Sequence, residues 1–339
     1  MNGDHFCKTA AWTRRTWLNA AAAVLAMPFG AIAQPQAALP RIGMLSSGSA
    51  GSGALRNGYE QFLNGLRELG YVQGKNIGFE WRYGDGKPER LRPLAAELIE
   101  LDVAMIVAGG PACIEAARAV TSRTPILAVG GSDPVGEGWA RSLAHPGGNV
   151  TGLTVTYPEL GAKRLGLLKQ AAPAMARTAV MLAPSELDAE SNKAGLLAGA
   201  RAIGLELLWL EVGSPADFES AFMRSAQDRA DGFCALGTNL IVTHRRRLAE
   251  LALQQRLPSI SDFPIMAQAG FLTSYGADLA ALYGRSVLYV DKILKGARPG
   301  DLPIERPTRM ELVFNLATAR TIGLTLPEDL VRQANRLIE

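Results

Sequence analysis

Short apolar runs alternate with helix-like patterns along almost the whole chain, and this alternation limits the possible folds more than any other feature. Residues 42–45 have the pattern of a buried strand, and residues 54–69 then carry apolar side chains at helical spacing. Strand and helix continue to alternate, which predicts an α/β fold with parallel sheets covered by helices on both faces. The predicted strands of the first half are 42–45, 77–81, 103–108 and 126–129, and its predicted helices are 54–69, 89–100 and 112–120.

The second half repeats this order at similar spacing. Gly70 corresponds to Gly204, and Pro125 before one strand corresponds to Pro258 before another. Each half therefore reads as a doubly wound lobe, and an internal duplication is plausible from the pattern alone. The predicted strands here are 178–182, 205–212, 232–236 and 259–260, and the predicted helices are 188–203, 216–229 and 244–255.

Elements beyond the second series are expected to cross back between the lobes. Residues 271–275 read as a strand and 279–294 as a helix, followed by segments 311–314, 317–322 and 327–337. Proline and glycine cluster at residues 145–152, where we expect the first crossing. We therefore assign residues 40–150 plus about 277–300 to lobe 1 and residues 151–276 plus about 301–339 to lobe 2, joined by a hinge of more than one strand.

The first 33 residues have the composition of an export signal. Arg14 and Arg15 precede an apolar run at residues 20–29, and a small-x-small site follows at residues 31–33. Two arginines fit both a twin-arginine signal and an ordinary secretion signal, so the export route stays open. We expect cleavage near Ala33 and a periplasmic, soluble mature protein.

Charge and cysteine content exclude several classes of function. Without residues 1–33 the chain keeps 32 basic and 31 acidic residues, which is no electrostatic footprint for nucleic acid. Cys113 and Cys234 fall in different halves and are expected to be buried free thiols. His145 and His244 have no cysteine or carboxylate at ligand spacing, so we expect no metal site and no cofactor.

Candidate ligand-binding residues lie in the loops after the predicted strands, where doubly wound sheets bind their ligands. Other interpretations remain open for some of them: Asp133 as a turn residue, Tyr275 as a packing residue of the hinge, and Glu186, Thr238 and Asn239 as helix caps. The glycine- and serine-rich loop at residues 46–53 lacks the ending of a phosphate-binding loop, and its serines suit a carboxylate. The candidates are Ser46, Ser47, Gly109, Gly110, Pro111, Ser132, Asp133, Ser185, Glu186, Thr238, Asn239, Asp262 and Tyr275.

Several ordered blocks resemble a known family. They include residues 65–71 with 74–77, 133–138, 145–152, 274–276, and 289–297 with 302–305. Together they resemble the substrate-binding proteins of ABC transporters of the tryptophan/tyrosine-uptake type, which have a type I periplasmic-binding-protein fold. The resemblance implies an extracytoplasmic carrier that closes on a small molecule and delivers it to an ABC permease in the inner membrane. We expect this carrier to be monomeric. Aromatic amino acids are ligands of some members.

We therefore predict a solute-binding protein of an ABC importer, with an amino acid or another small carboxylate as ligand and no catalysis. The mature sequence contains no Gly-x-Ser-x-Gly elbow and too few histidines for an evident catalytic triad. Two alternatives stay open: a ligand-binding subunit that feeds a sensor, and a two-domain hydrolase or isomerase. Fold resemblance alone does not exclude catalysis.

Overall fold

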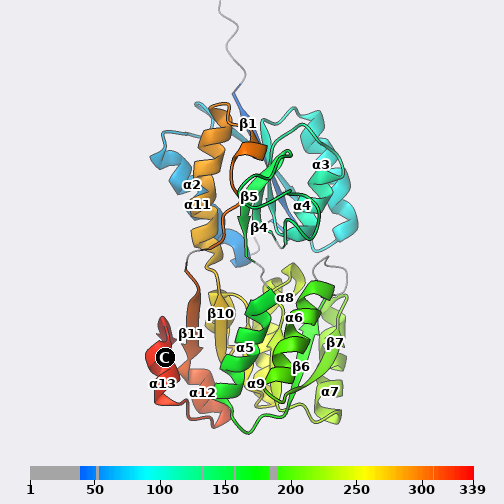
Figure 1. The fold of residues 1–339 in the computed structure, drawn as a ribbon, viewed down its shortest axis with the longest axis vertical. Helices are drawn as coiled ribbons and strands as arrows, with labels where there is room; N and C mark the ends of the chain where they lie inside the picture. Colours follow the sequence, from blue (N-terminus) through cyan, green and yellow to red (C-terminus); the bar gives the residue numbers. More distant parts are fainter. Residues whose placement is uncertain (1–38, 51–52, 132, 156–157, 184–188, 308) are drawn as a thin grey trace, which may run out of the picture. The chain divides into compact units, whose positions relative to one another are not determined.

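The computed structural model describes residues 39–50, 53–131, 133–155, 158–183, 189–307 and 309–339. These residues form two sheets, each covered by helices on both faces (Figure 1). The predicted export signal and the candidates Ser132, Ser185 and Glu186 lie outside the described residues.

The first sheet has five parallel strands in the order β2-β1-β3-β4-β5. Helices α2 and α11 pack against each other on one face of this sheet, and α3 and α4 cover the other (Figure 1). The inner strands β1, β3 and β4 are buried, which explains why they are nearly continuous apolar runs. The elements are β1 (Arg41–Ser46), α2 (Gly53–Glu68), β2 (Gly78–Tyr83), α3 (Leu91–Glu100), β3 (Met105–Gly109), α4 (Pro111–Arg118), β4 (Ile126–Gly131), β5 (Val150–Thr154) and α11 (Leu279–Leu294).

The second sheet has seven strands in the order β12-β11-β10-β9-β8-β6-β7, and only the β10–β11 pair is antiparallel. Its strands are β6 (Arg177–Leu182), β7 (Glu206–Glu211), β8 (Gly232–Ala235), β9 (Ser259–Ser261), β10 (Thr273–Gly276), β11 (Glu311–Asn315) and β12 (Arg336–Ile338). Its helices are α5 (Pro158–Ala171), α6 (Ala189–Ala202), α7 (Phe218–Gln227), α8 (Asn239–Thr243), α9 (Arg245–Gln254), α10 (Pro264–Gln268), α12 (Leu316–Ile322) and α13 (Glu328–Gln333).

The two halves share one strand order, as the repeated sequence pattern predicted. The first four strands run β2-β1-β3-β4 across the first sheet, and their counterparts run β7-β6-β8-β9 across the second. All of these pairs are parallel. The prediction of two doubly wound lobes is confirmed by this topology.

The described chain passes between the sheets three times. It leaves the first sheet after Thr154, returns at residues 277–278 between β10 and α11, and leaves again before β11. Residues 302–305 stay with the first sheet, because the Glu305 amide donates to the Gly152 carbonyl at 2.9 Å and the Thr154 amide donates to the Glu305 carbonyl at 3.1 Å. The sequence assigned residues 151–154 and 302–305 to lobe 2, and the strand pairing places both with the first sheet instead.

Strand β5 shows why the first crossing was predicted too early. Val150 to Thr154 are buried, although the preceding prolines and glycines suggested a turn. Gly152 has φ of 141°, and a Cβ atom there would lie 2.0 Å from the Ala128 carbonyl oxygen on β4. This glycine therefore permits close approach of two strands rather than a turn.

Two other elements differ from the sequence prediction. Helix α5 was not predicted, because two glycines and a buried arginine interrupt its apolar pattern. The predicted segment 327–337 is not continuous: α13 ends at Gln333, and the Asn335 side chain then accepts from the Leu312 amide at 2.8 Å. That contact aligns the following residues as strand β12 beside β11.

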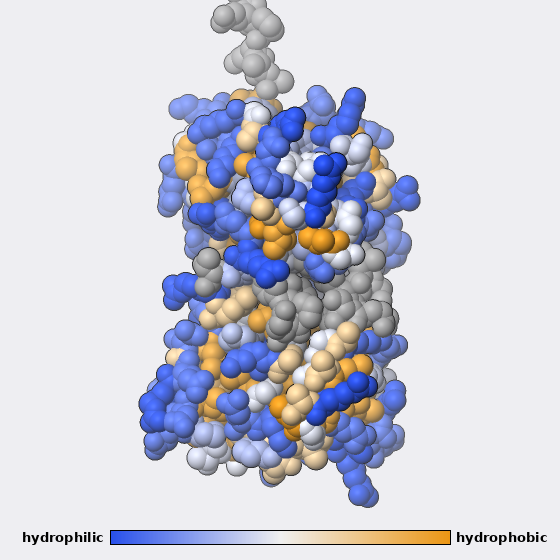
Figure 2. Space-filling model, in the orientation of Figure 1, coloured by the Kyte–Doolittle hydropathy of each residue, from blue (hydrophilic) through white to orange (hydrophobic). Residues whose placement is uncertain are grey.

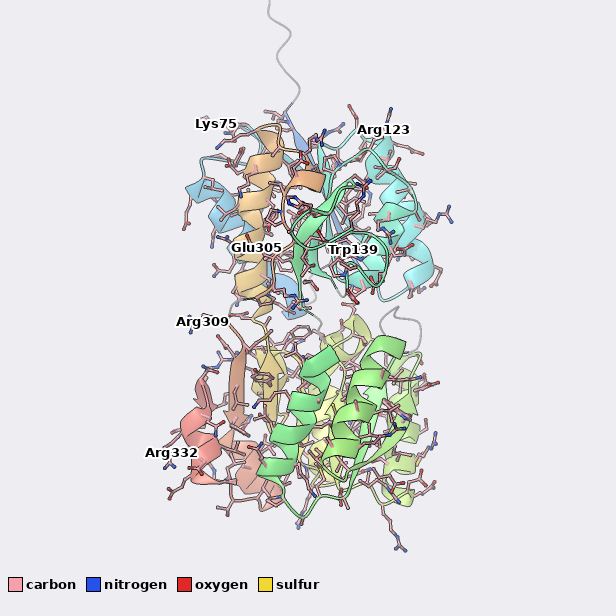
Figure 3. The ribbon with its side chains drawn as sticks, in the orientation of Figure 1. Lys75, Arg123, Trp139, Glu305, Arg309 and Arg332 are labelled. Carbon is pink, nitrogen blue, oxygen red and sulfur yellow. The ribbon has the colours of Figure 1, made fainter. Side chains whose placement is uncertain are left out.

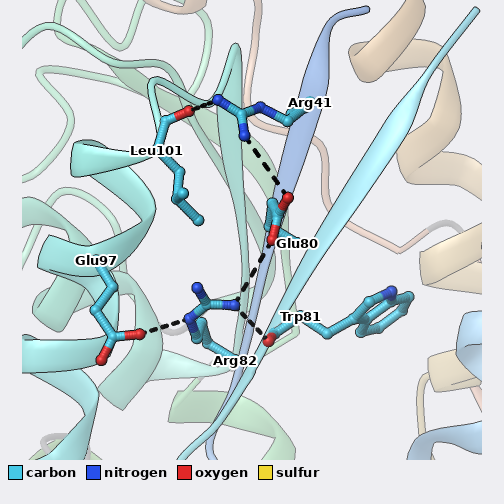
Figure 4. Close-up of polar contacts among 6 residues, drawn as sticks. All are labelled: Arg41, Glu80, Trp81, Arg82, Glu97 and Leu101. Carbon is cyan, nitrogen blue, oxygen red and sulfur yellow. Dashed lines mark hydrogen bonds and ion pairs between the residues drawn. The ribbon is translucent and has the colours of Figure 1, made fainter.

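Two charged residues of the edge strand β2 belong to a chain of ion pairs that also includes residues of β1 and α3 (Figure 4). Glu80 lies 3.8 Å from both Arg41 and Arg82, and Arg82 also contacts Glu97 on α3 at 2.7 Å. Arg41 donates in addition to the Leu101 carbonyl. Charged side chains on an edge strand discourage pairing with another chain.

The face of the molecule in Figure 2 is mainly hydrophilic, with apolar side chains exposed in small separate groups. Such scattered exposure is ordinary for a folded chain. An internal cavity is therefore a better candidate for a binding site than this face.

Candidate functional site

One cavity lies beyond the carboxyl ends of strands from both sheets. Its volume is about 120 Å³, several times the roughly 10–15 Å³ that one water molecule needs, so it has room for a small organic molecule. Strands β1, β3 and β4 contribute from the first sheet, and β6, β8 and β9 from the second. The lining residues are Ser47, Gly109, Gly110, Pro111, Ala112, Val129, Gly130, Val155, Leu182, Ala183, Leu236, Gly237, Thr238, Asn239, Val242, Asp262, Phe263, Leu279 and Tyr283.

The amino-terminal end of α4 forms part of the cavity wall. Gly110 precedes the helix with φ of 85° and provides no side-chain cap, and Pro111 and Ala112 line the cavity. The first amides of a helix lack partners within the helix, and they attract anions. The first amide that bonds back to Gly110 is that of Ile114, so the start of this helix is suited to a carboxylate.

A chain of hydroxyl groups supports the same wall. Tyr283 on α11 lines the cavity, and its side chain is hydrogen-bonded to the side chain of Tyr59 on α2. The Tyr59 side chain is in turn hydrogen-bonded to the side chain of Ser46. Burial raises the pKa of Tyr59 to about 12 and holds the pKa of Tyr283 well above its usual value, so both phenols are neutral. Ser46 therefore does not line the cavity, and it is connected to the lining residue Tyr283 only through Tyr59.

Trp139 supports the wall behind β4 (Figure 3). Its ring packs where a Cβ atom at Gly131 would lie, at 3.2 Å, and its Nε1 donates to Glu137 at 3.0 Å. The tryptophan is 5% exposed. It thereby fixes the end of β4, whose residues Val129 and Gly130 face the cavity.

The wall from the second sheet is mainly apolar, with two polar residues at one edge. Leu182, Leu236 and Phe263 line it, and Asn239 and Thr238 lie at the start of α8. The Thr238 hydroxyl accepts from the Ile241 amide at 3.5 Å and so caps α8 while also lining the cavity. Both interpretations of Thr238, cap and lining residue, thus fit the structure.

Asp262 places a carboxylate in the cavity lining. Its side chain is 19% exposed and lies 3.3 Å from the guanidinium of Arg164. Burial raises the pKa of Asp262, while Arg164 and the Gly237 amide act against this shift. Apart from the neutral Tyr283, Asp262 is the only titratable residue among the described lining residues.

Arg164 is the functional candidate that the sequence analysis missed. It lies on α5, is 6% exposed, and its Nε donates to the Tyr275 carbonyl at 2.8 Å. A signal was present: an arginine directly before the apolar residues Leu165, Leu167 and Leu168. Because α5 itself was not predicted, that signal had no structural context.

The structure brings together seven of the predicted residues and separates three others from the cavity lining. The seven lining residues are Ser47, Gly109, Gly110, Pro111, Thr238, Asn239 and Asp262. Besides Ser46, the separated residues are Asp133 and Tyr275. The Asp133 carboxylate accepts from the Val135 amide at 3.2 Å within a turn, and Tyr275 packs against the core of the second sheet.

The described residues give little support for a metal site or for a membrane-spanning helix. Cys113 and Cys234 are buried and form no disulfide, as predicted, and the described residues contain no metal-holding cluster of histidine, cysteine and carboxylate side chains. His244 stacks edge-on with Phe218, and Arg247 pairs with Glu219. Nowhere in the described ranges is a helix long and apolar enough to cross a membrane.

Comparison with known proteins gives consistent matches. The family model for the ABC transporter substrate binding protein matches residues 51–338. A tyrosine-binding protein of Clostridioides difficile (strain R20291) is 24% identical over 263 residues, which cover 78% of this chain and 75% of that protein.

Two solved structures show the same fold with a TM-score of 0.82 each. One is a conserved domain protein from Vibrio cholerae O1 biovar El Tor, 26% identical, with 88% of this chain and 99% of that chain covered. The other is an ABC domain from Streptococcus pneumoniae in complex with L-Trp, 22% identical, with 88% of this chain and 100% of that chain covered.

Proposed function

From the premise that the chain belongs to the ABC transporter substrate-binding protein family, and is a substrate-binding protein rather than an enzyme, we propose its ligand class and its partner. The ligand is an amino acid or another small carboxylate with an apolar or aromatic part. The protein carries it to an ABC permease of the inner membrane. The prediction of a type I periplasmic-binding-protein fold is confirmed by the topology and by these structural neighbours.

The observation that carries the ligand class is the distribution of groups in the cavity. The start of α4, where Gly110 provides no side-chain cap, and the Ser47 hydroxyl suit a carboxylate. Asp262, in the wall from the second sheet, suits a protonated amine. Apolar side chains, among them Leu236 and Phe263, suit the rest of such a molecule.

The names of two relatives support the same class. One is described as a tyrosine-binding protein, and another was solved with L-Trp. Both are less than 25% identical to this chain, so they support an amino acid in general rather than a particular one.

Delivery to a permease follows from closure of the lobes around the ligand. Two lobes joined by crossing segments favour hinge motion, and a ligand held by both lobes stabilises the closed state. The export signal predicted at residues 1–33 and the family together support a location outside the inner membrane.

A thermal-shift panel of amino acids and small carboxylates tests the ligand class. A ligand that binds only the folded state raises the melting temperature. Asp262→Asn should abolish or reduce the shift for compounds with an amine, while Asp228→Asn, an exposed carboxylate paired with Arg224, serves as the matched control. Absence of any shift across the panel, in protein freed of endogenous ligand by unfolding and refolding, would contradict the proposed class.

A further inference from the structure

Arg164 is a buried cation that contacts both a cavity-lining residue, Asp262, and the end of strand β10, which leads to a crossing. Its guanidinium lies 3.3 Å from the carboxylate of Asp262, and its Nε donates to the Tyr275 carbonyl at 2.8 Å. Arg164 is only 6% exposed, so both contacts are largely shielded from solvent. A buried cation is costly unless it is paired, which makes its position unlike that of an ordinary surface arginine.

The Asp262 carboxylate is only partly satisfied by these neighbours. Its Oδ1 atom is buried and makes no hydrogen bond to any described residue, although Arg164 lies within ion-pair distance. A buried acceptor without a hydrogen bond is unfavourable, and the Arg164 guanidinium is the group beside it that offsets this cost. The Asp262 side chain is 19% exposed and lines the cavity, so a ligand can meet its exposed part while the buried Oδ1 stays beside Arg164.

We propose that Arg164 is a positioning residue that keeps Asp262 ionised and aimed into the cavity, so that the site selects ligands carrying a protonated amine over otherwise identical ligands without one. This inference rests on the proposed function. It adds a residue outside the lining that determines which ligand is accepted.

The backbone around the pair fixes its geometry. The Asp262 carbonyl oxygen packs against Gly276, where a Cβ atom would lie 1.8 Å away, and Tyr275 immediately precedes that glycine. Arg164 therefore holds the carboxylate of Asp262 and the last residues of β10 in one arrangement. The crossing at residues 277–278 begins directly after them.

Cys234 on β8 is a titratable group that interacts electrostatically with both members of the pair. Burial raises the pKa of its thiol to about 12, so it stays neutral. Burial also raises the pKa of Asp262, and the Arg164 cation opposes that shift. Removing the cation is therefore expected to move the titration of Asp262 to higher pH.

The first test measures the titration of Asp262 in the ligand-free protein by ¹³C NMR of its carboxyl carbon, assigned with Asp262→Asn. The pKa of Asp262 should be higher in Arg164→Gln than in wild type, and Arg164→Lys should restore much of the wild-type value because it keeps the charge. Lys163→Gln, an exposed neighbour on α5, removes one charge and should change nothing. An unchanged titration in Arg164→Gln would overturn the proposal, whatever the ligand.

The second test measures selectivity by calorimetric titration with L-tyrosine and with 3-(4-hydroxyphenyl)propanoate, which lacks the amine. Arg164→Gln should weaken L-tyrosine binding about 10- to 100-fold, the range for a hydrogen bond to a charged group, and should affect the amine-free compound much less. Equal weakening of both compounds would show a merely structural role and overturn the proposal. If wild type binds neither compound, the proposed ligand class fails on this probe, while the NMR titration still decides the role of Arg164.

Discussion

Replacing Gly109 by alanine tests how tightly the cavity wall packs against Tyr283. A Cβ atom at Gly109 would lie 2.5 Å from the Tyr283 hydroxyl oxygen, closer than side-chain contacts allow. Its next neighbours would be the Leu45 carbonyl oxygen at 3.7 Å and the Tyr283 Cζ atom at 3.9 Å, both at ordinary distances. Gly109→Ala should therefore lower the free energy of unfolding by about 1–3 kcal/mol, the usual cost of overpacking.

Removing the hydroxyl should relieve this clash. Tyr283→Phe alone loses the contact with Tyr59 and should cost about 0.5–1.5 kcal/mol. In the double variant Gly109→Ala/Tyr283→Phe, the new methyl group meets only the ring, so the added cost of Gly109→Ala should nearly disappear. The two substitutions should then show a coupling energy of about 1–3 kcal/mol.

Urea unfolding of the four proteins measures this cycle, since a shift in midpoint at constant slope reports a change in stability. Gly110→Ala is the matched control: its Cβ atom would meet nothing within 4 Å, but its φ of 85° strains an alanine. That cost, about 1–3 kcal/mol, should not be rescued by Tyr283→Phe. Additive effects of Gly109→Ala and Tyr283→Phe would refute the packing described here.

Further predictions follow from single contacts. Since its raised pKa makes the folded state bind a proton more tightly, Asp262 should contribute stability at acid pH that is lost as pH rises through its folded pKa. Asp262→Asn should remove that component from urea unfolding measured across the acid range, and an unchanged profile would contradict it. Binding of an amine ligand should weaken as pH falls through the same pKa, as calorimetry at several pH values would show. In Gly152→Ala the new Cβ atom would lie 2.0 Å from the Ala128 carbonyl oxygen, so the free energy of unfolding should fall by about 3 kcal/mol or more. A melting temperature equal to that of wild type would refute this. Thr238→Ala should cost about 1 kcal/mol through the lost cap of α8, and Thr238→Ser should recover most of it in the same unfolding assay.

The repeated strand order was predictable because each lobe is built from local patterns. An apolar run of strand length followed by an amphipathic helix identifies one unit, and parallel connections leave few arrangements. Gly152 shows the limit of this reasoning. A glycine that permits close strand packing and a glycine that permits a turn look alike in sequence, and only the position of Ala128 on the neighbouring strand distinguishes them.

The cavity was partly predictable for a similar reason. Residues directly after parallel strands meet at one edge of a sheet, and this rule placed Gly109, Thr238 and Asp262 in the lining. It also selected Asp133 and Tyr275, whose turn and packing contacts direct them elsewhere. Contacts between segments that are distant in the sequence could not be predicted from it. The lining position of Tyr283 and the pairing of Arg164 with Asp262 depend on helices that pack against strands far along the chain.

Native mass spectrometry of the chain purified from the periplasm of an expressing bacterium tests the central claim most directly. The account predicts one small molecule bound per chain, released on denaturation and identified as an amino acid or another small carboxylate. The same preparation of Asp262→Asn should carry less of that molecule if it has an amine. A released ligand without a carboxylate, or one bound equally by Asp262→Asn despite an amine, would contradict the account.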